Sequence, residues 1–167
     1  MNENVDAVRI VEVLNRHRVV YVIIGGYAAE LHAVADLPPT RDVDVCPATG
    51  RENLGRLSAA LTELRALIRT DAVDGGLPFS HGPESLARAK TWNLVCDAGE
   101  LDITFEPAAG GYEHLAVHAI TVDLLGHPVP VAAIDDVIAS KTAAGRPKDL
   151  AALPALVRHR RRTEDSG

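Results

Sequence analysis

A short apolar segment at 19–24, followed directly by Gly25 and Gly26, constrains the fold of this chain more than any other feature. Its β-branched residues predict a buried strand, and glycines allow the backbone to turn sharply and to approach a phosphate closely. A second short strand is predicted at 43–47, after Pro38-Pro39, because the residue before a proline favours an extended backbone. The chain therefore places a glycine turn near a second strand.

Two carboxylates, Asp42 and Asp44, lie at the start of this second strand. Alternate residues of a strand point to the same side, so the two side chains should be roughly 6–7 Å apart on one face. Carboxylates together with substrate phosphates are ligands that Mg²⁺ prefers, and a pair of such ions can hold both reacting oxygens of an in-line displacement. A lone Asp-x-Asp is commonly only a solvated strand face. The first hypothesis is phosphoryl or nucleotidyl transfer.

A third acid, Asp102, lies between Leu101 and Ile103 in a segment that predicts another strand. Burying an aspartate there is costly unless it is paired, hydrogen-bonded or bound to a metal. If this strand lies beside 43–47, all three carboxylates share one site. Asp102 could then accept the proton of an incoming nucleophile.

The remaining pattern predicts helices around a small mixed sheet, which is an α/β or α+β domain. Helices are expected at 5–16, 26–34, 51–68, 134–144 and 147–159, strands at 91–97, 101–106, 118–124 and 128–131, a hairpin turn at 98–100, and an irregular loop at 71–88. We expect residues 1–132 to form the core, and residues 133–167 to complete the same domain with helices and a frayed basic tail.

The net charge of −6 argues against broad electrostatic attraction to nucleic acid. Basic residues gather late in the chain, however, at Lys141, Arg146 and Lys148 and again in the cluster 158–162. These clusters could contact a phosphate backbone. Alternatively, the terminal cluster only complements the end of a helix, and Lys141 is only a surface lysine.

No apolar run is long enough to span a membrane, so no membrane partner is expected. Both cysteines, Cys46 and Cys96, lie in apolar strand-like segments and are expected to be reduced core residues. The predicted location is therefore cytoplasmic.

Four blocks of the sequence together resemble a known family: Gly-Gly-Tyr-Ala at 25–28, Pro-Thr-Arg-Asp-Val-Asp at 39–44, Gly-Glu-Leu-Asp at 99–102, and Ser-Lys at 140–141 with Gly-Arg-Pro-Lys-Asp-Leu at 145–150. The chain resembles the DNA polymerase β-like nucleotidyltransferases and, more narrowly, the AbiEii-type (MenT-like) nucleotidyltransferase toxins. The resemblance implies a small mixed sheet flanked by helices, with a short C-terminal helical segment.

The resemblance also implies roles for individual residues. Asp42, Asp44 and Asp102 would bind Mg²⁺ or Mn²⁺. The triphosphate of a bound NTP would lie between Gly25, Gly26 and Lys141, with Thr40 and Arg146 also at the nucleotide. Asp149 would position Lys141 or Arg146, and both Lys141 and Asp149 would matter for activity. Alternatively, Arg146 and Asp149 form a solvated first turn of a helix. A phosphate on Thr40 would crowd the carboxylates, which makes Thr40 a hypothetical off-switch.

The activity implied is transfer of NMP from an NTP to the 3′ acceptor end of tRNA, with release of pyrophosphate. This would block translation and make the protein the toxin of a pair with a cognate antitoxin. Two alternatives stay open: nucleotidyl transfer to a small-molecule or protein hydroxyl, and a catalytically silent module that binds a nucleotide or a partner.

Overall fold

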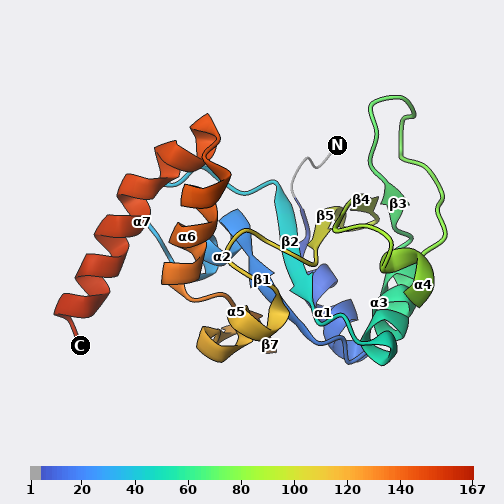
Figure 1. Ribbon diagram of the computed structural model, residues 1–167, viewed down its shortest axis with the longest axis horizontal. Helices are drawn as coiled ribbons and strands as arrows, with labels where there is room; N and C mark the ends of the chain where they lie inside the picture. The colour runs from blue at the N-terminus through green and yellow to red at the C-terminus, as the bar shows by residue number, and fades with distance from the viewer. Residues whose placement is uncertain (1–4) are drawn as a thin grey trace.

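The computed structural model describes residues 5–167, and it consists of one seven-stranded sheet with helices packed against it (Figure 1). The helices are α1 (Ala7–Arg16), α2 (Gly25–Leu31), α3 (Arg51–Glu63), α4 (Pro83–Leu86), α5 (Tyr112–His118), α6 (Ile134–Ala144) and α7 (Pro147–Asp165). The strands are β1 (Tyr21–Ile24), β2 (Asp42–Pro47), β3 (Leu67–Ile68), β4 (Thr91–Cys96), β5 (Gly99–Thr104), β6 (Ile120–Leu124) and β7 (His127–Val131). Residues 1–4, the start of the predicted core, lie outside the described residues.

The sheet has the strand order β3-β4-β5-β2-β1-β7-β6 and is mixed, as predicted. Strands β2 and β5 are parallel, as are β1 and β7, whereas the other neighbours are antiparallel. The three strands at the centre, β1, β2 and β5, therefore bring the glycine turn and the predicted acids together.

Alternating burial fixes the orientation of the central strands. Val43 and Val45 of β2 are fully buried, as are Leu101 and Ile103 of β5. Each buried side chain of this size contributes about 1.5–3 kcal/mol relative to an exposed one. A shift of one residue would exchange the two faces of a strand. Burial of the apolar residues therefore also fixes the face on which the intervening Asp44 and Asp102 lie.

The predicted helix at 51–68 is too long. The helix α3 ends at Glu63, and Arg65 adopts a positive φ of 55°, which turns the chain back. Leu67 and Ile68 then form β3, which pairs with Val95 and Leu94 of β4. Pairing with the edge of the sheet satisfies these backbone groups and overrides the apolar helical spacing.

Other element boundaries also differ from the predictions. The helix α2 ends at Leu31 rather than at 34. Residues 112–118 form α5, although only a strand that begins at 118 was expected there. The predicted loop contains α4, the hairpin turn lies at 97–98, and α7 continues through the basic cluster to Asp165.

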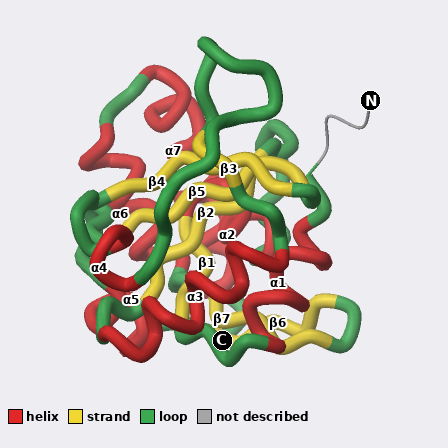
Figure 2. The backbone as a smooth tube through the Cα atoms, turned by 90° about the vertical axis from the view of Figure 1, so that its right-hand side faces the viewer, coloured by secondary structure: helices red, strands yellow, loops and turns green. Residues whose placement is uncertain are grey.

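The segment between β3 and α4 projects beyond the sheet at its β3 edge (Figures 1 and 2). At the other side, α6 packs against α2 and α7. Among the described residues, no helix has both the length and the apolar character needed to cross a membrane.

Candidate active site

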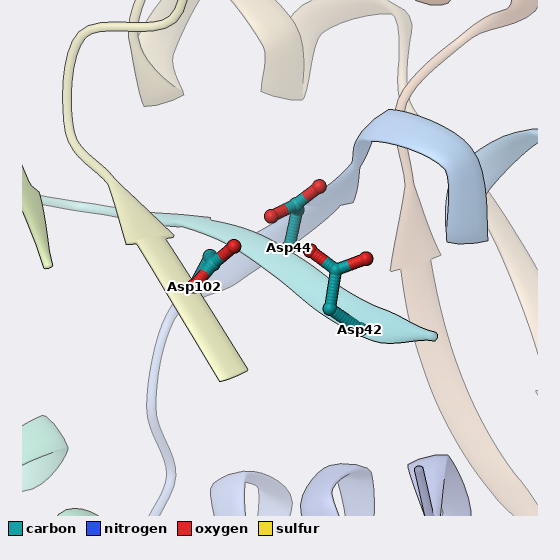
Figure 3. Close-up of side chains that lie close together, drawn as sticks. All are labelled: Asp42, Asp44 and Asp102. Carbon is teal, nitrogen blue, oxygen red and sulfur yellow. The ribbon is translucent and has the colours of Figure 1, made fainter. Parts of the chain in front are cut away.

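The strand β2 presents Asp42 and Asp44 on the face opposite to its buried valines. Asp44 is paired in register with Ile24, at the end of β1, and with Asp102 on β5. The three carboxylates consequently lie side by side on one face of the sheet (Figure 3). We refer to Asp42, Asp44 and Asp102 as the acidic triad.

One carboxylate oxygen from each residue of the acidic triad lies within 4.8 Å of the other two. The side chain of Asp102 is only 13% exposed. The structure therefore brings together the three acids that the sequence predicted to share a site. Their roles in binding a metal and in catalysis stay predictions.

Burial and mutual repulsion raise the pKa values of two members of the acidic triad. The pKa of Asp44 rises to about 7, mainly through burial and then through the nearby Asp42 and Asp102, although Lys141 and Lys148 lower it. The pKa of Asp102 rises to about 6, again mainly through burial and then through Asp42. Burial and the neighbouring carboxylates therefore disfavour the ionised forms of Asp44 and Asp102 more than the nearby basic side chains favour them.

A divalent cation fits this donor set. The oxygen Oδ1 of Asp102 is buried and accepts no hydrogen bond from the described residues, and its one cationic neighbour among them is Nη2 of Arg69 at 3.0 Å. Clustered carboxylate oxygens are the hard ligands that Mg²⁺ and Mn²⁺ prefer. A cation would also neutralise the repulsion that raises the pKa values of Asp44 and Asp102.

The glycine turn lies directly against the acidic triad. Gly25, the first residue of α2, has a positive φ of 69°, and a Cβ atom there would collide with the carboxylate of Asp44. A Cβ atom on Gly26 would lie 3.2 Å from Oγ1 of Thr40. The absence of side chains at these glycines therefore allows Asp44 and Thr40 to approach the start of α2.

Asp149 lies in the first turn of α7, and its side chain is only 3% exposed. Its Oδ2 accepts a hydrogen bond of 2.6 Å from Nε of Arg146, and its Oδ1 lies 3.6 Å from Nζ of Lys141. The pKa of Asp149 is lowered, chiefly by the hydrogen bond from Arg146. Asp149 thus contacts both basic residues that it was predicted to position, and it is not the solvated residue of the alternative interpretation.

Arg69 is a site residue that the sequence interpretation missed. Its Nη2 lies 3.0 Å from Oδ1 of Asp102 and donates a hydrogen bond of 3.3 Å to Oδ2. The predicted helix at 51–68 hid this residue, because Arg69 reaches Asp102 only when β3 pairs with β4. A strand predicted at 67–68 would have led to Arg69, because it would have placed this residue beside β4 and β5.

The basic cluster at 158–162 is partly neutralised by acidic residues. Arg158 lies 3.9 Å from a carboxylate oxygen of Asp36, and Arg160 lies 3.3 Å from one of Asp135. Lys148, at the start of α7, is exposed and lies close enough to lower the pKa of Asp44. Besides Arg69, which contacts Asp102, positive charge near the acidic triad comes from the α6–α7 corner (residues 141–149), where Lys141 and Lys148 lower the pKa of Asp44.

Solved structures of nucleotidyltransferases share this fold. The lincosamide antibiotic adenylyltransferase LnuA, solved with lincomycin bound, superposes with a TM-score of 0.60 at 13% identity, over 92% of this chain and 97% of LnuA. The antibiotic-resistance factor ANT(2'')-Ia gives a TM-score of 0.56 at 15% identity, over 89% of this chain and 78% of that one. An antigenic nucleotidyltransferase-like protein from Paracoccidioides brasiliensis gives 0.51 at 17% identity, over 89% and 72%.

At these identities the likeness establishes the fold, which is that of the nucleotidyltransferases. No protein-family model matches the chain. No curated protein sequence matches it either.

Proposed function

We propose that this protein is a metal-dependent nucleotidyltransferase that transfers NMP from an NTP to a hydroxyl group. The observation that carries the proposal is the acidic triad, in which carboxylate oxygens from β2 and β5 lie within 4.8 Å of one another. The position of the acidic triad beside the glycine turn, in a fold shared with nucleotidyltransferases, also supports the proposal.

Asp42, Asp44 and Asp102 would hold Mg²⁺ or Mn²⁺. When bound, the cation supplies charge neutralisation for the phosphates and orientation for an in-line displacement. The backbone at Gly25 and Gly26 would accommodate the triphosphate, with Thr40 beside it. Lys141, held by Asp149, would place a positive charge next to the phosphates, and Arg146 would add a second.

The reaction proposed is a single displacement at phosphorus. The oxygen of the acceptor hydroxyl forms a bond to the α-phosphorus, and the bond from that phosphorus to the bridging oxygen of pyrophosphate breaks. The hydroxyl proton passes to the carboxylate of Asp102 and then to solvent. Pyrophosphate leaves with the electron pair of the broken bond.

The acceptor that we propose is the 3′ end of tRNA, which would make the protein a toxin with a cognate antitoxin and place it in the cytoplasm. The motif blocks listed above for the AbiEii-type toxins support this proposal. The exposed Lys148 near the acidic triad supports it as well, because a nearby positive charge attracts a phosphate backbone.

A small-molecule hydroxyl is the second candidate acceptor. The match covers 97% of LnuA, whose structure was solved with lincomycin bound. A protein with this fold can therefore bind a small molecule. The net charge of −6 and the pairing of Arg158 and Arg160 with acids also weaken the case for nucleic acid.

One incubation separates these candidates. Purified protein is mixed with each α-³²P-labelled NTP, Mg²⁺, and either total tRNA or a panel of hydroxylated antibiotics, with Asp44→Asn as the matched inactive control. Label on tRNA supports the toxin, and label on a small molecule supports the second candidate. Binding of NTP without transfer to any acceptor, protein included, would contradict the proposal and favour a silent binding module.

A further inference from the structure

Arg69 is anchored to the sheet at its backbone and along its side chain. Its N–H donates a hydrogen bond of 2.9 Å to the carbonyl of Asn93, which continues the pairing of β3 with β4. Its Nη1 then donates one of 3.2 Å to the carbonyl of Leu94. The side chain therefore crosses β4 with few conformations open to it, and its guanidinium arrives at β5.

At β5 the guanidinium contacts two acids on the same face of the strand. Nη2 lies 3.0 Å from Oδ1 of Asp102, and Nη1 lies 3.3 Å from Oε2 of Glu100. Glu100 is 46% exposed, whereas Asp102 is 13% exposed. The contact with Asp102 is consequently the better shielded from solvent, and it is the one that reaches the acidic triad.

The strand fixes only the direction of the Cα–Cβ bond of Asp102. Rotation about χ2, which decides where the two oxygens point, has a broad energy profile for aspartate. A planar guanidinium is pre-organised to hold a carboxylate in one orientation. Among the described residues, neither Asp42 nor Asp44 forms an ion pair with an arginine, so this restraint is particular to Asp102.

We infer that Arg69 is a positioning residue, which fixes the carboxylate of Asp102 so that it faces Asp42, Asp44 and the attacking hydroxyl. The inference rests on the proposed function of the acidic triad and adds to it a residue outside the four motif blocks. Groups that orient metal-binding carboxylates typically change metal affinity or activity by about 10- to 100-fold.

The first test compares Arg69→Met and Arg69→Lys with the wild type. For Arg69→Met we expect Mn²⁺ affinity, measured by isothermal titration without substrate, to fall by about 10- to 100-fold. At saturating Mn²⁺ the kcat should fall similarly while the KM for NTP is unchanged, because the glycine turn and Lys141 do not contact Arg69. Arg69→Lys keeps the charge without the planar fork and should lose less.

Arg88→Gln is the matched control, because Arg88 is exposed and has no ion pair within the described part of the chain. Wild-type values are expected for it. Thermal unfolding checks that each variant folds. If Arg69→Met does not fold, Arg69→Lys decides the question: Mn²⁺ affinity equal to that of the wild type would overturn the inference.

The second test is a double-mutant cycle with Asp102→Asn, read as Mn²⁺ affinity. If Arg69 acts through Asp102, Arg69→Met causes no further loss in the Asp102→Asn background. An equal loss in both backgrounds would overturn the inference. Absence of NMP transfer by the wild-type protein to any acceptor would instead contradict the proposed function, whatever the Mn²⁺ titrations show for Arg69.

Discussion

The pKa values of buried aspartates are shifted in opposite directions in the acidic triad and at Asp149. In the acidic triad, three carboxylates lie together, and the pKa values of Asp44 and Asp102 are raised. At the start of α7, one nearly inaccessible carboxylate contacts two basic side chains, and its pKa is lowered. The two sites are neighbours, because Lys141 contacts Asp149 and also lowers the pKa of Asp44.

Asp149 is as buried as the acidic triad and yet has a lowered pKa, so the groups that contact a buried aspartate distinguish these two sites. Burial alone raises the pKa of any carboxyl, and nearby charges then decide the net direction. Asp149 already has its cations within the chain, whereas the acidic triad has a surplus of negative charge that a divalent cation can neutralise. Four predictions can break or sharpen this comparison.

The largest effect is expected for Asp44→Asn, which removes one charge from the acidic triad with little change in shape. Loss of a metal ligand that supplies several kcal/mol of transition-state stabilisation should lower the rate of NMP transfer about a thousandfold. The free energy of unfolding without metal should stay equal or rise, because repulsion is relieved. Asp36→Asn, at an exposed acid, is the control and should keep wild-type activity; a similar rate for both variants would contradict the comparison.

Asp149→Asn should have the opposite profile. It leaves Lys141, which is only 17% exposed, without its carboxylate, so the free energy of unfolding should fall by about 2 kcal/mol. Urea denaturation measures this loss. We expect transfer activity to fall less than in Asp44→Asn, since Lys141 is still present. A variant of Asp149 as stable as the wild type would show that these contacts are not structural.

The two glycines offer a matched pair of substitutions. Gly25→Ala introduces a side chain at a positive φ and into the carboxylate of Asp44, so unfolding should become easier by about 1–2 kcal/mol. Gly26→Ala has an ordinary helical backbone and meets only Oγ1 of Thr40 at 3.2 Å, which that side chain can relieve by rotating. In thermal denaturation the Tm of Gly25→Ala should therefore be lower than that of Gly26→Ala. The reverse order would contradict the geometry described for the turn.

The last prediction concerns pH in the absence of metal. The pKa of Asp44 is about 7 in the folded protein, against an ordinary value of 3.8, so the folded state holds a proton that the unfolded state has lost. Stability from this group is full below pH 4 and is lost as the pH rises toward 7, by about 4 kcal/mol at 1.36 kcal/mol for each pKa unit. Asp149, with a lowered pKa, contributes no change in this window.

Unfolding measured at pH 5 and pH 8 tests this prediction. The wild type should lose more stability than Asp44→Asn over that interval, and added Mg²⁺ should recover more at pH 8 than at pH 5. The same pH dependence in both proteins would mean that the Asp44 carboxyl is not responsible.

The sequence was sufficient to predict the centre of the sheet and the acidic triad. The alternation around Val43 placed Asp42 and Asp44 on one face, and the apolar neighbours of Asp102 placed it inside a strand. These inferences succeed because strand periodicity is local and the core enforces it.

Features that depend on distant contacts were not predictable in this way. The two residues of β3 form a strand only because β4 offers an edge to pair with, and Arg69 reaches Asp102 only through that pairing. The length of α3 was misjudged for the same reason. The contacts of Asp149 with Lys141 and Arg146 were expected only from the family resemblance, because residue spacing does not determine how α6 and α7 pack.

The most direct test of the acidic triad as a cation site is a crystal structure of the protein with Mn²⁺ and a non-hydrolysable NTP analogue, measured at the manganese absorption edge. We predict an anomalous difference peak bound by oxygens of Asp42, Asp44 and Asp102, and no peak at Asp149. A fully occupied nucleotide without manganese at the acidic triad, or with manganese bound elsewhere, would contradict the account.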